Sequence, residues 1–305
     1  MLGGGIAQVF AIAGHPVILA DADAELTKRN LARLIAEAKD WEGRGLFLPG
    51  QAALVEKHLS AAPSIEEAVA DADYIQEAVP EKPEIKDAVL RRIEAAARPD
   101  AIIASNTSTL PIGGLAKSLN KADRFLGVHF SNPSPFIPGV EVILHAGTDE
   151  SLVPEVEELV RSTGKLTARL SDSPGFVLNR LQYALLKEAI SIVDDGVASA
   201  EDVDIITRTT FGFRLPFFGP FAIADMAGLD IYLDCFKTFE DNFGERFATP
   251  EGLKKLVAEG HLGTKSGGGF VIPAGDTTDL VAYRNTAYAR LQQLLAELGE
   301  APGVK

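Results

Sequence analysis

The sequence lacks paired cysteines, an excess of positive charge and long apolar runs. Cys235 is the only cysteine among 305 residues, which excludes an intrachain disulfide and a thiolate metal cluster and favours a reducing compartment. Lysine and arginine number 29 against 43 acidic residues, and the net charge of −14 argues against nucleic-acid binding. No apolar run approaches about 18 residues, so no membrane span is expected. We therefore expect a cytoplasmic protein with no metal, no nucleic-acid partner and no membrane span.

The length of 305 residues suggests two domains, at roughly 150 residues per domain. In the first part of the chain, short apolar runs alternate with helical patterns, which is typical of βαβ units in a mostly parallel, doubly wound sheet. The expected strands are residues 16–20, 72–79, 101–105, 125–130, 140–143 and 165–170. The expected helices between them include residues 26–38, 85–97 and 153–162.

The pattern changes at residues 171–175, where a Ser-Asp-Ser-Pro-Gly segment interrupts the alternation. Beyond it, apolar residues recur at helical spacing from Leu181 to Val193, and strand signals are few. Helices are expected around residues 200–209, 221–243 and 278–298. The sequence therefore predicts an α/β domain of the Rossmann type over residues 1–171 and an all-helical domain over residues 172–305.

A glycine turn opens the chain. Gly3, Gly4 and Gly5 precede a helical pattern, and such a turn lets the backbone approach a pyrophosphate at a helix N-terminus. Gly3 and Gly5 are thus candidate cofactor-binding residues, although a flexible N-terminus before a helix would show the same sequence pattern.

Asp21 adds to this signal because it ends an apolar strand 18 residues after Gly3. An acidic residue at about this spacing binds the ribose hydroxyls of a dinucleotide, whereas the alternative is a helix N-cap. Asp23 lies two residues further on and no arginine follows Asp21 directly, so a 2′-phosphate would be repelled. The expected cofactor is NAD rather than NADP.

The dinucleotide fingerprint also requires a strand and two glycines before Gly3, and Met1 and Leu2 are too few residues to form them. In this fold that strand is central, with neighbours on both sides. The sequence therefore predicts that the natural protein starts about ten residues upstream, with an apolar strand and the first glycines. The alternative is that the 305-residue form folds with a gap or a rearranged sheet edge and binds NAD poorly.

His129 and Glu141 are the strongest candidates for catalysis. His129 lies near the end of an apolar strand, where a lone histidine is more often a core residue. Glu141, however, is an ionisable residue inside the next apolar run, where burial is costly unless the charge is paired. A glutamate beside the imidazole would fix its tautomer, as a general base requires. The polar segment 105–109 follows another strand, at the edge where doubly wound sheets bind ligands, although it could simply cap a helix.

Several segments resemble the 3-hydroxyacyl-CoA dehydrogenase family, in the family's order and spacing. They are residues 3–21, 77–81 with Lys86, 105–108, 129–133 with 140–142, 172–180 and 263–270. The resemblance covers nearly the whole chain. It implies an NAD-binding Rossmann domain, a helical domain for substrate binding and homodimerisation, and a place in fatty acid metabolism.

The resemblance also implies roles for individual residues. His129 would take the hydroxyl proton and Glu141 would orient it, while Ser108 would bind the reacting oxygen and Asn179 the substrate. The other positions that match cofactor-contacting residues are Asp21, Glu81, Lys86, Asn132 and Lys265, with Ser108 beside the nicotinamide. The implied reaction is the oxidation of a 3-hydroxyacyl-CoA to the 3-oxoacyl-CoA with NAD.

Some positions depart from the acyl-CoA members of the family. Ser131 stands where those members usually have phenylalanine, and Pro138 and Gly139 stand where bulkier or basic residues are usual. Ser131 and the segment 136–138 resemble relatives that oxidise free hydroxy acids or other small alcohols. Basic residues after Asp21 could contact CoA phosphates, although interleaved acidic residues make a solvated helix face equally compatible. These basic residues are Lys28, Arg29, Arg33, Lys39 and Arg44.

Of these two substrates, we favour acyl-CoA. A third hypothesis is a non-catalytic relative that keeps the fold as a binding or structural protein, which the missing first strand would favour. The presence of Ser108, His129, Glu141 and Asn179 together argues against it, because a structural protein has no need of that set.

Overall fold

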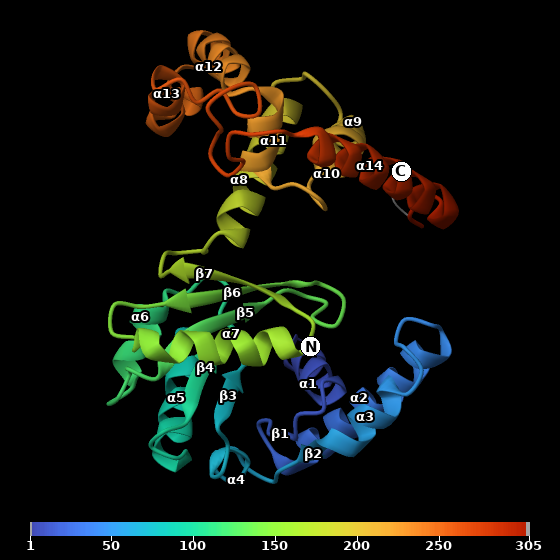
Figure 1. The fold of residues 1–305 in the computed structure, drawn as a ribbon. Coiled ribbons are helices and arrows are strands. Elements are labelled where there is room, and N and C mark those ends of the chain that lie inside the picture. Colours follow the sequence, from blue (N-terminus) through green and yellow to red (C-terminus); the bar gives the residue numbers. More distant parts are fainter. Residues whose placement is uncertain (1, 303–305) are drawn as a thin grey trace. The chain divides into compact units, whose positions relative to one another are not determined.

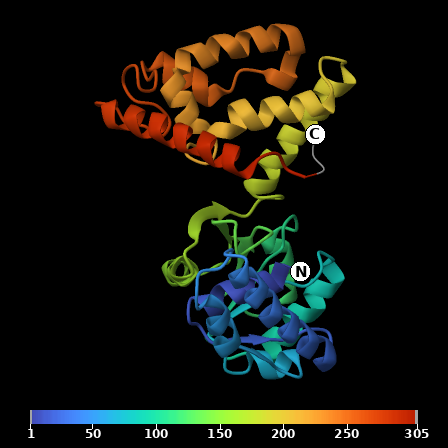
Figure 2. The ribbon, with the colours of Figure 1, turned by 90° about the vertical axis from the view of Figure 1, so that its right-hand side faces the viewer.

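The computed structural model describes residues 2–302. The chain divides into two compact units, Met1–Leu185 and Leu186–Lys305 (Figures 1 and 2). The change of sequence pattern near Asp172 falls at the end of the last strand, whereas the division between the units falls within the helix that follows.

The first unit is built on a five-stranded sheet in the order β3-β4-β5-β6-β7. The strands are β3 (Tyr74–Glu77), β4 (Ile102–Ser105), β5 (Phe125–Phe130), β6 (Gly139–Leu144) and β7 (Leu166–Ser171). All neighbouring pairs are parallel except β5 and β6, which are antiparallel. The mostly parallel sheet predicted from the alternating pattern is thus confirmed.

A second, two-stranded parallel sheet pairs β1 (Val17–Leu19) with β2 (Leu59–Ala61). Among residues 2–302 no strand precedes α1 (Leu2–Ile12), and β1 is not hydrogen-bonded to β3.

Seven helices of the first unit surround these sheets (Figure 1). They are α1, α2 (Ala24–Gly43), α3 (Gln51–His58), α4 (Ile65–Val69), α5 (Pro83–Ala96), α6 (Ile112–Leu115) and α7 (Val153–Ser162). Local chemistry explains where they begin: the Asp23 side chain caps α2 by accepting from the Leu26 amide at 2.7 Å, and Pro83 opens α5.

Helices cover both faces of the central strands. Ile103 of β4 packs in one apolar cluster with Leu90 of α5, while the adjacent Ile102 packs in another with Val156 of α7. Every residue of β4 and β5 is buried. Strands buried on both faces are a property of parallel sheets, and this explains why these segments are continuously apolar.

The second unit is helical, as the sequence predicted. Its helices are the end of α8 (Leu178–Asp194), α9 (Ala200–Ile206), a π-helix (Thr207–Phe211), α10 (Gly212–Arg214), α11 (Pro220–Ala227), α12 (Leu229–Phe243), α13 (Glu251–Ala258) and α14 (Thr278–Leu298). The single helix predicted over residues 221–243 is wrong. Gly228, at φ +108°, breaks it into α11 and α12, because this backbone conformation cannot continue a helix.

The glycine-rich segment 263–270 folds around a buried carboxylate of the same unit. Asp225 accepts hydrogen bonds from the amides of Phe270, Val271 and Ile272 at 2.8, 2.9 and 2.9 Å. A Cβ on Gly269 would overlap this carboxylate. The late glycines are therefore explained by close packing within the helical unit.

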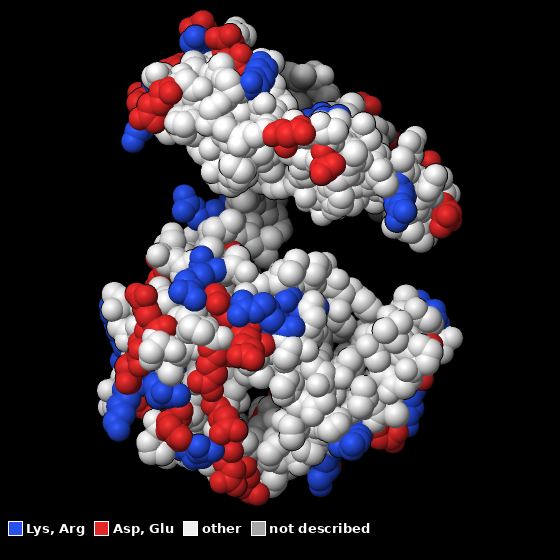
Figure 3. All heavy atoms as spheres, in the orientation of Figure 1, with Lys and Arg blue, Asp and Glu red and all other residues white. Residues whose placement is uncertain are grey.

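Charged side chains of both signs lie on the surface of each unit (Figure 3). Within residues 2–302, no helix has the combination of length and apolar character that crossing a membrane requires.

Candidate active site

His129 and Glu141 lie directly opposite each other on the antiparallel strands β5 and β6. Their side chains meet, with His129 Nδ1 2.7 Å from Glu141 Oε2. His129 is only 4% exposed, and the ring of Phe176 lies against it at a centroid distance of 5.8 Å. The strand pairing thus produces the histidine–glutamate pair that the sequence suggested, with the histidine buried and the glutamate partly buried.

The second oxygen of Glu141 is also used. Oε1 accepts hydrogen bonds from the amides of Val177 and Leu178, at 3.0 and 2.9 Å, where α8 begins. Burial, the largest effect, raises the pKa of Glu141, but the hydrogen bonds from His129 and these amides outweigh it and lower the pKa. An ionised carboxylate only accepts, so Nδ1 of His129 carries the proton and Nε2 of the neutral ring is left as an acceptor.

Ser108 lies on the other side of the imidazole and is held at three atoms. Its Oγ is 3.1 Å from His129 Nε2, and its carbonyl oxygen accepts from Asn179 Nδ2 at 2.7 Å. Its amide donates to Glu81 Oε1 at 2.9 Å. The structure therefore brings together the four residues predicted for catalysis, and Glu81 beside them.

Glu81 anchors the whole loop that follows β4. Its Oε1 accepts from Thr107 Oγ1 at 2.6 Å and from the Thr109 amide at 2.9 Å, in addition to Ser108. Burial, the largest effect, raises the pKa of Glu81, but the hydrogen bonds from this loop and the charge of Lys86 outweigh it and lower the pKa to about 2. Glu81 is therefore an acceptor throughout the neutral pH range.

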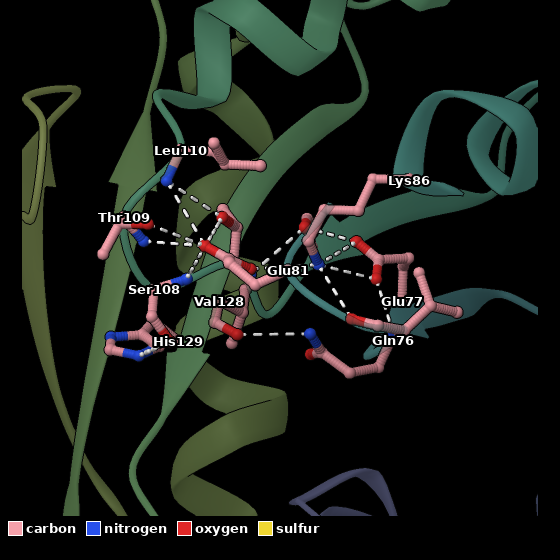
Figure 4. A network of polar contacts seen from close by, with 12 residues as sticks. Gln76, Glu77, Glu81, Lys86, Ser108, Thr109, Leu110, Val128 and His129 are labelled. Carbon is pink, nitrogen blue, oxygen red and sulfur yellow. Dashed lines mark hydrogen bonds and ion pairs between the residues drawn. The ribbon is translucent and has the colours of Figure 1, made fainter. Parts of the chain in front are cut away.

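Lys86, which the sequence placed among the cofactor contacts, is buried among protein oxygens (Figure 4). Its Nζ is 2.9 and 3.2 Å from the two oxygens of Glu77, 3.2 Å from the Val79 carbonyl and 3.5 Å from Glu81 Oε2. An ammonium has three protons, so these acceptors satisfy it without an external ligand.

The first turn of α1 fits a dinucleotide. A Cβ on Gly3 would lie 3.2 Å from Ala78 Cβ, just beyond β3, and one on Gly5 would lie 2.9 Å from Pro135 Cδ. Only glycine lets the helix start this close to its neighbours, and the first amides of a helix have no intrahelical partners. This cradle suits a pyrophosphate.

Asp21 lies two residues beyond β1, as a ribose-binding carboxylate should. Oδ1 accepts from the Ala22 amide at 2.8 Å and Oδ2 accepts from Asn30 Nδ2 at 2.8 Å. Each carboxylate oxygen has a second lone pair, so both can still accept from ribose hydroxyls.

Two candidates remain, Asn132 and Lys265. Asn132 is exposed in the loop after β5. Lys265 belongs to the helical unit, where its Nζ pairs with Asp230 at 2.8 Å.

Four of the five basic residues considered for CoA phosphates form ion pairs. Their pairs are Lys28–Glu25, Arg33–Glu37, Lys39–Glu56 and Arg44–Asp40, at 3.0, 2.8, 2.9 and 3.3 Å. Much of the basic charge along α2 and at its C-terminal end is thus already balanced by carboxylates.

Sequence reasoning gave no role to Glu77 or Asn30. Glu77 shows the same signal as Glu141, an ionisable residue within an apolar strand, and that signal could have identified it. Asn30 carries no such signal, since its contact with Asp21 depends on how α2 packs after its first turn.

Two models of one protein family match this chain. Residues 1–173 match the family model for the NAD-binding domain of 3-hydroxyacyl-CoA dehydrogenase, and residues 175–272 match the model for its C-terminal domain. The probable 3-hydroxybutyryl-CoA dehydrogenase of Bacillus subtilis is 36% identical over 271 residues, which cover 88% of this chain and 93% of that protein.

Two further relatives cover almost the whole chain. The 5-formyl-3-hydroxy-2-methylpyridine 4-carboxylate 5-dehydrogenase of Mesorhizobium japonicum is 32% identical over 296 residues, 96% of this chain and 95% of that one. The crystal structure of a 3-hydroxyacyl-CoA dehydrogenase from Archaeoglobus fulgidus superposes with a TM-score of 0.80 at 30% identity, covering 97% of this chain and 95% of that one. The protein therefore belongs to the 3-hydroxyacyl-CoA dehydrogenase family and is an NAD-dependent oxidoreductase.

Proposed function

We propose that the protein oxidises a 3-hydroxyacyl-CoA to the 3-oxoacyl-CoA, with His129 as the general base. The observation that carries this proposal is the orientation of the imidazole, whose Nδ1 is tied to Glu141 while Nε2 lies 3.1 Å from Ser108 Oγ. A substrate hydroxyl that replaces this direct contact would accept a hydrogen bond from Ser108 Oγ and donate its proton to Nε2. NAD, when bound, supplies the hydride acceptor.

The other residues of the site support that proton transfer. Glu141 stabilises the imidazolium as it forms, because its carboxylate is ionised and only 2.7 Å from Nδ1. Ser108 Oγ donates a hydrogen bond to the reacting oxygen, and Asn179 holds the Ser108 carbonyl and so orients the loop. Gly3, Gly5, Asp21 and Asn132 would bind the cofactor. The contacts among His129, Glu141, Ser108 and Asn179 support a catalytic role rather than a non-catalytic one.

A free hydroxy acid is the alternative substrate. The ion pairs along α2 leave few cations for CoA phosphates, and one relative named above acts, by its name, on a pyridine carboxylate. The names of the other two relatives favour acyl-CoA.

The substrate class is tested by NADH-dependent reduction of acetoacetyl-CoA and of free acetoacetate. If CoA contributes binding, kcat/KM for the thioester should exceed that for the free acid by about 100-fold or more. Free CoA added to the acetoacetate assay is the control for activation without covalent attachment. Turnover of acetoacetate alone would contradict the acyl-CoA substrate and favour the hydroxy acid.

Asp21→Ser tests the proposed contact with the adenosine ribose. The variant loses the carboxylate that binds the hydroxyls and repels a 2′-phosphate, so the NAD/NADP ratio of kcat/KM should fall by about tenfold or more. Asp23→Ser is the matched control, because serine can still cap α2. Equal ratios in the wild type and Asp21→Ser would rule out this role for Asp21.

We also propose a homodimer formed through the helical unit. The part of α8 in this unit exposes apolar side chains, with Leu186 and Ile190 both 51% exposed, and no residue of α8 is buried. Figure 3 shows a broad area of the helical unit with few charges. Exposed apolar surface of this kind is typical of association sites.

Sedimentation velocity tests the dimer directly. The wild type should sediment with twice the 32.5 kDa mass of one chain. Ile190→Asp should shift the protein towards the monomer, because an interface cannot readily bury an unpaired carboxylate. A monomeric wild type at micromolar concentration would exclude the proposed dimer.

A further inference from the structure

The buried ion pair of Glu77 and Lys86 has no role in the proton transfer described above. Glu77 is the last residue of β3 and Lys86 lies in α5, and their side chains are 0% and 1% exposed. Taking both charges out of water is costly, and an apolar pair of similar size often stabilises a protein as well or better. The pair therefore calls for an explanation beyond stability.

Every contact of Glu77 ties β3 to a neighbouring segment. Oε1 accepts from Lys86 Nζ at 2.9 Å and from the Val79 amide at 2.7 Å. Oε2 accepts from Ser105 Oγ, at the end of β4, at 2.5 Å. Ser105 Oγ in turn accepts from the Thr107 amide at 3.2 Å. Glu77 is thus connected, through Ser105, to the loop that carries Ser108.

Lys86 is connected to the same loop by a second route, through Glu81. Its ammonium lies between two carboxylates, 2.9 Å from Glu77 Oε1 and 3.5 Å from Glu81 Oε2. Glu81 then binds the amides of Ser108 and Thr109 through its other oxygen. Direct contacts therefore run from Glu77 through Lys86 and Glu81 to Ser108, and from Ser108 Oγ to His129 Nε2 (Figure 4).

We propose that Glu77 and Lys86 are positioning residues, which hold Glu81 and the 107–109 loop so that Ser108 Oγ stays beside His129. The proposal rests on the function proposed above and deepens it. Glu77 balances the charge of Lys86, and without that balance the ammonium is drawn towards Glu81 alone. Glu81 would then turn away from the loop amides, and Ser108 would lose its fixed distance from the imidazole.

The ammonium of Lys86 faces the protein. The side chain is 1% exposed and its donors face Glu77, Val79 and Glu81. Lys86 is therefore placed to act on the loop through Glu81.

The first test is amide hydrogen exchange in the full-length protein, which needs no substrate. Glu77→Gln should accelerate exchange in a peptide covering residues 106–111 by about tenfold or more, because the loop loses its anchors. Peptides from β6 should be unchanged. Glu66→Gln is the matched control. It removes an exposed carboxylate that pairs at 2.7 Å with Arg92 of α5, the helix that also carries Lys86. Unchanged exchange in this loop would overturn the proposal, whatever the enzyme turns over.

The second test is a double-mutant cycle with Ser108→Ala, using whichever of acetoacetyl-CoA and acetoacetate the wild type reduces. Glu77→Gln alone should lower kcat by about 10- to 100-fold and leave the Kd for NADH within about threefold. In the Ser108→Ala background the same change should lower kcat by less than about threefold. Equal losses in both backgrounds would show that Glu77 does not act through Ser108 and would overturn the proposal.

Glu77→Asp covers the case in which the glutamine variant does not fold. It keeps the charge but shortens the side chain by one methylene, so both the exchange and the kcat should shift in the same direction by a smaller factor. Lys86→Met should behave like Glu77→Gln. A large rise in the Kd for NADH with Lys86→Met, without faster exchange of the loop, would instead indicate a cofactor contact and contradict the proposal.

Discussion

The carboxylate of Glu141 is the group on which the geometry of the active site depends. One oxygen binds His129 Nδ1 and the other binds the amides at the start of α8. This is possible because β6 runs antiparallel to β5, which places Glu141 opposite His129. A single buried charge therefore sets the tautomer of the base and fixes the position of the segment that carries Asn179. Loss of either contact, with the imidazole or with the amides, would leave one carboxylate oxygen without a hydrogen-bond donor.

Other carboxylates around the edge of the sheet act in a similar way. Glu81 holds the loop after β4, and Asp172, which follows β7, accepts from the amides of Ile112 and Gly113 at 2.9 and 2.8 Å where α6 begins. Loops at the carboxyl edge of a parallel sheet are otherwise its most mobile parts. Carboxylates that accept from several amides at once give these loops a fixed conformation, which catalysis by proton transfer requires.

Apolar runs predicted the interior of the fold well. Residues 125–130 form β5 over the predicted range, because a strand buried on both faces is apolar at nearly every position, with His129 as the exception here. The helix predicted over residues 278–298 is α14.

The antiparallel direction of β6 could not be predicted, since the periodicity of a strand does not depend on the direction of its neighbour. Gly228 was missed because a single glycine within a helical pattern is often tolerated.

The pairing of His129 with Glu141 could be anticipated because an ionisable residue inside an apolar run needs a partner. Identifying which partner Glu77 had required the fold, since Lys86 and Ser105 reach it from different elements. The partners of Lys86 also required the fold. Its position in the sequence matched a cofactor contact, but its burial and its partners are properties of the folded chain.

Steady-state turnover of His129→Gln tests the central claim most directly. Glutamine keeps a polar side chain but cannot take the hydroxyl proton, so kcat should fall by about 100-fold or more while the Kd for NADH stays within about threefold. His145→Gln is the matched control, because that histidine contacts the Ala122 carbonyl and lies outside the site. A His129→Gln enzyme that retains the wild-type kcat would contradict the account.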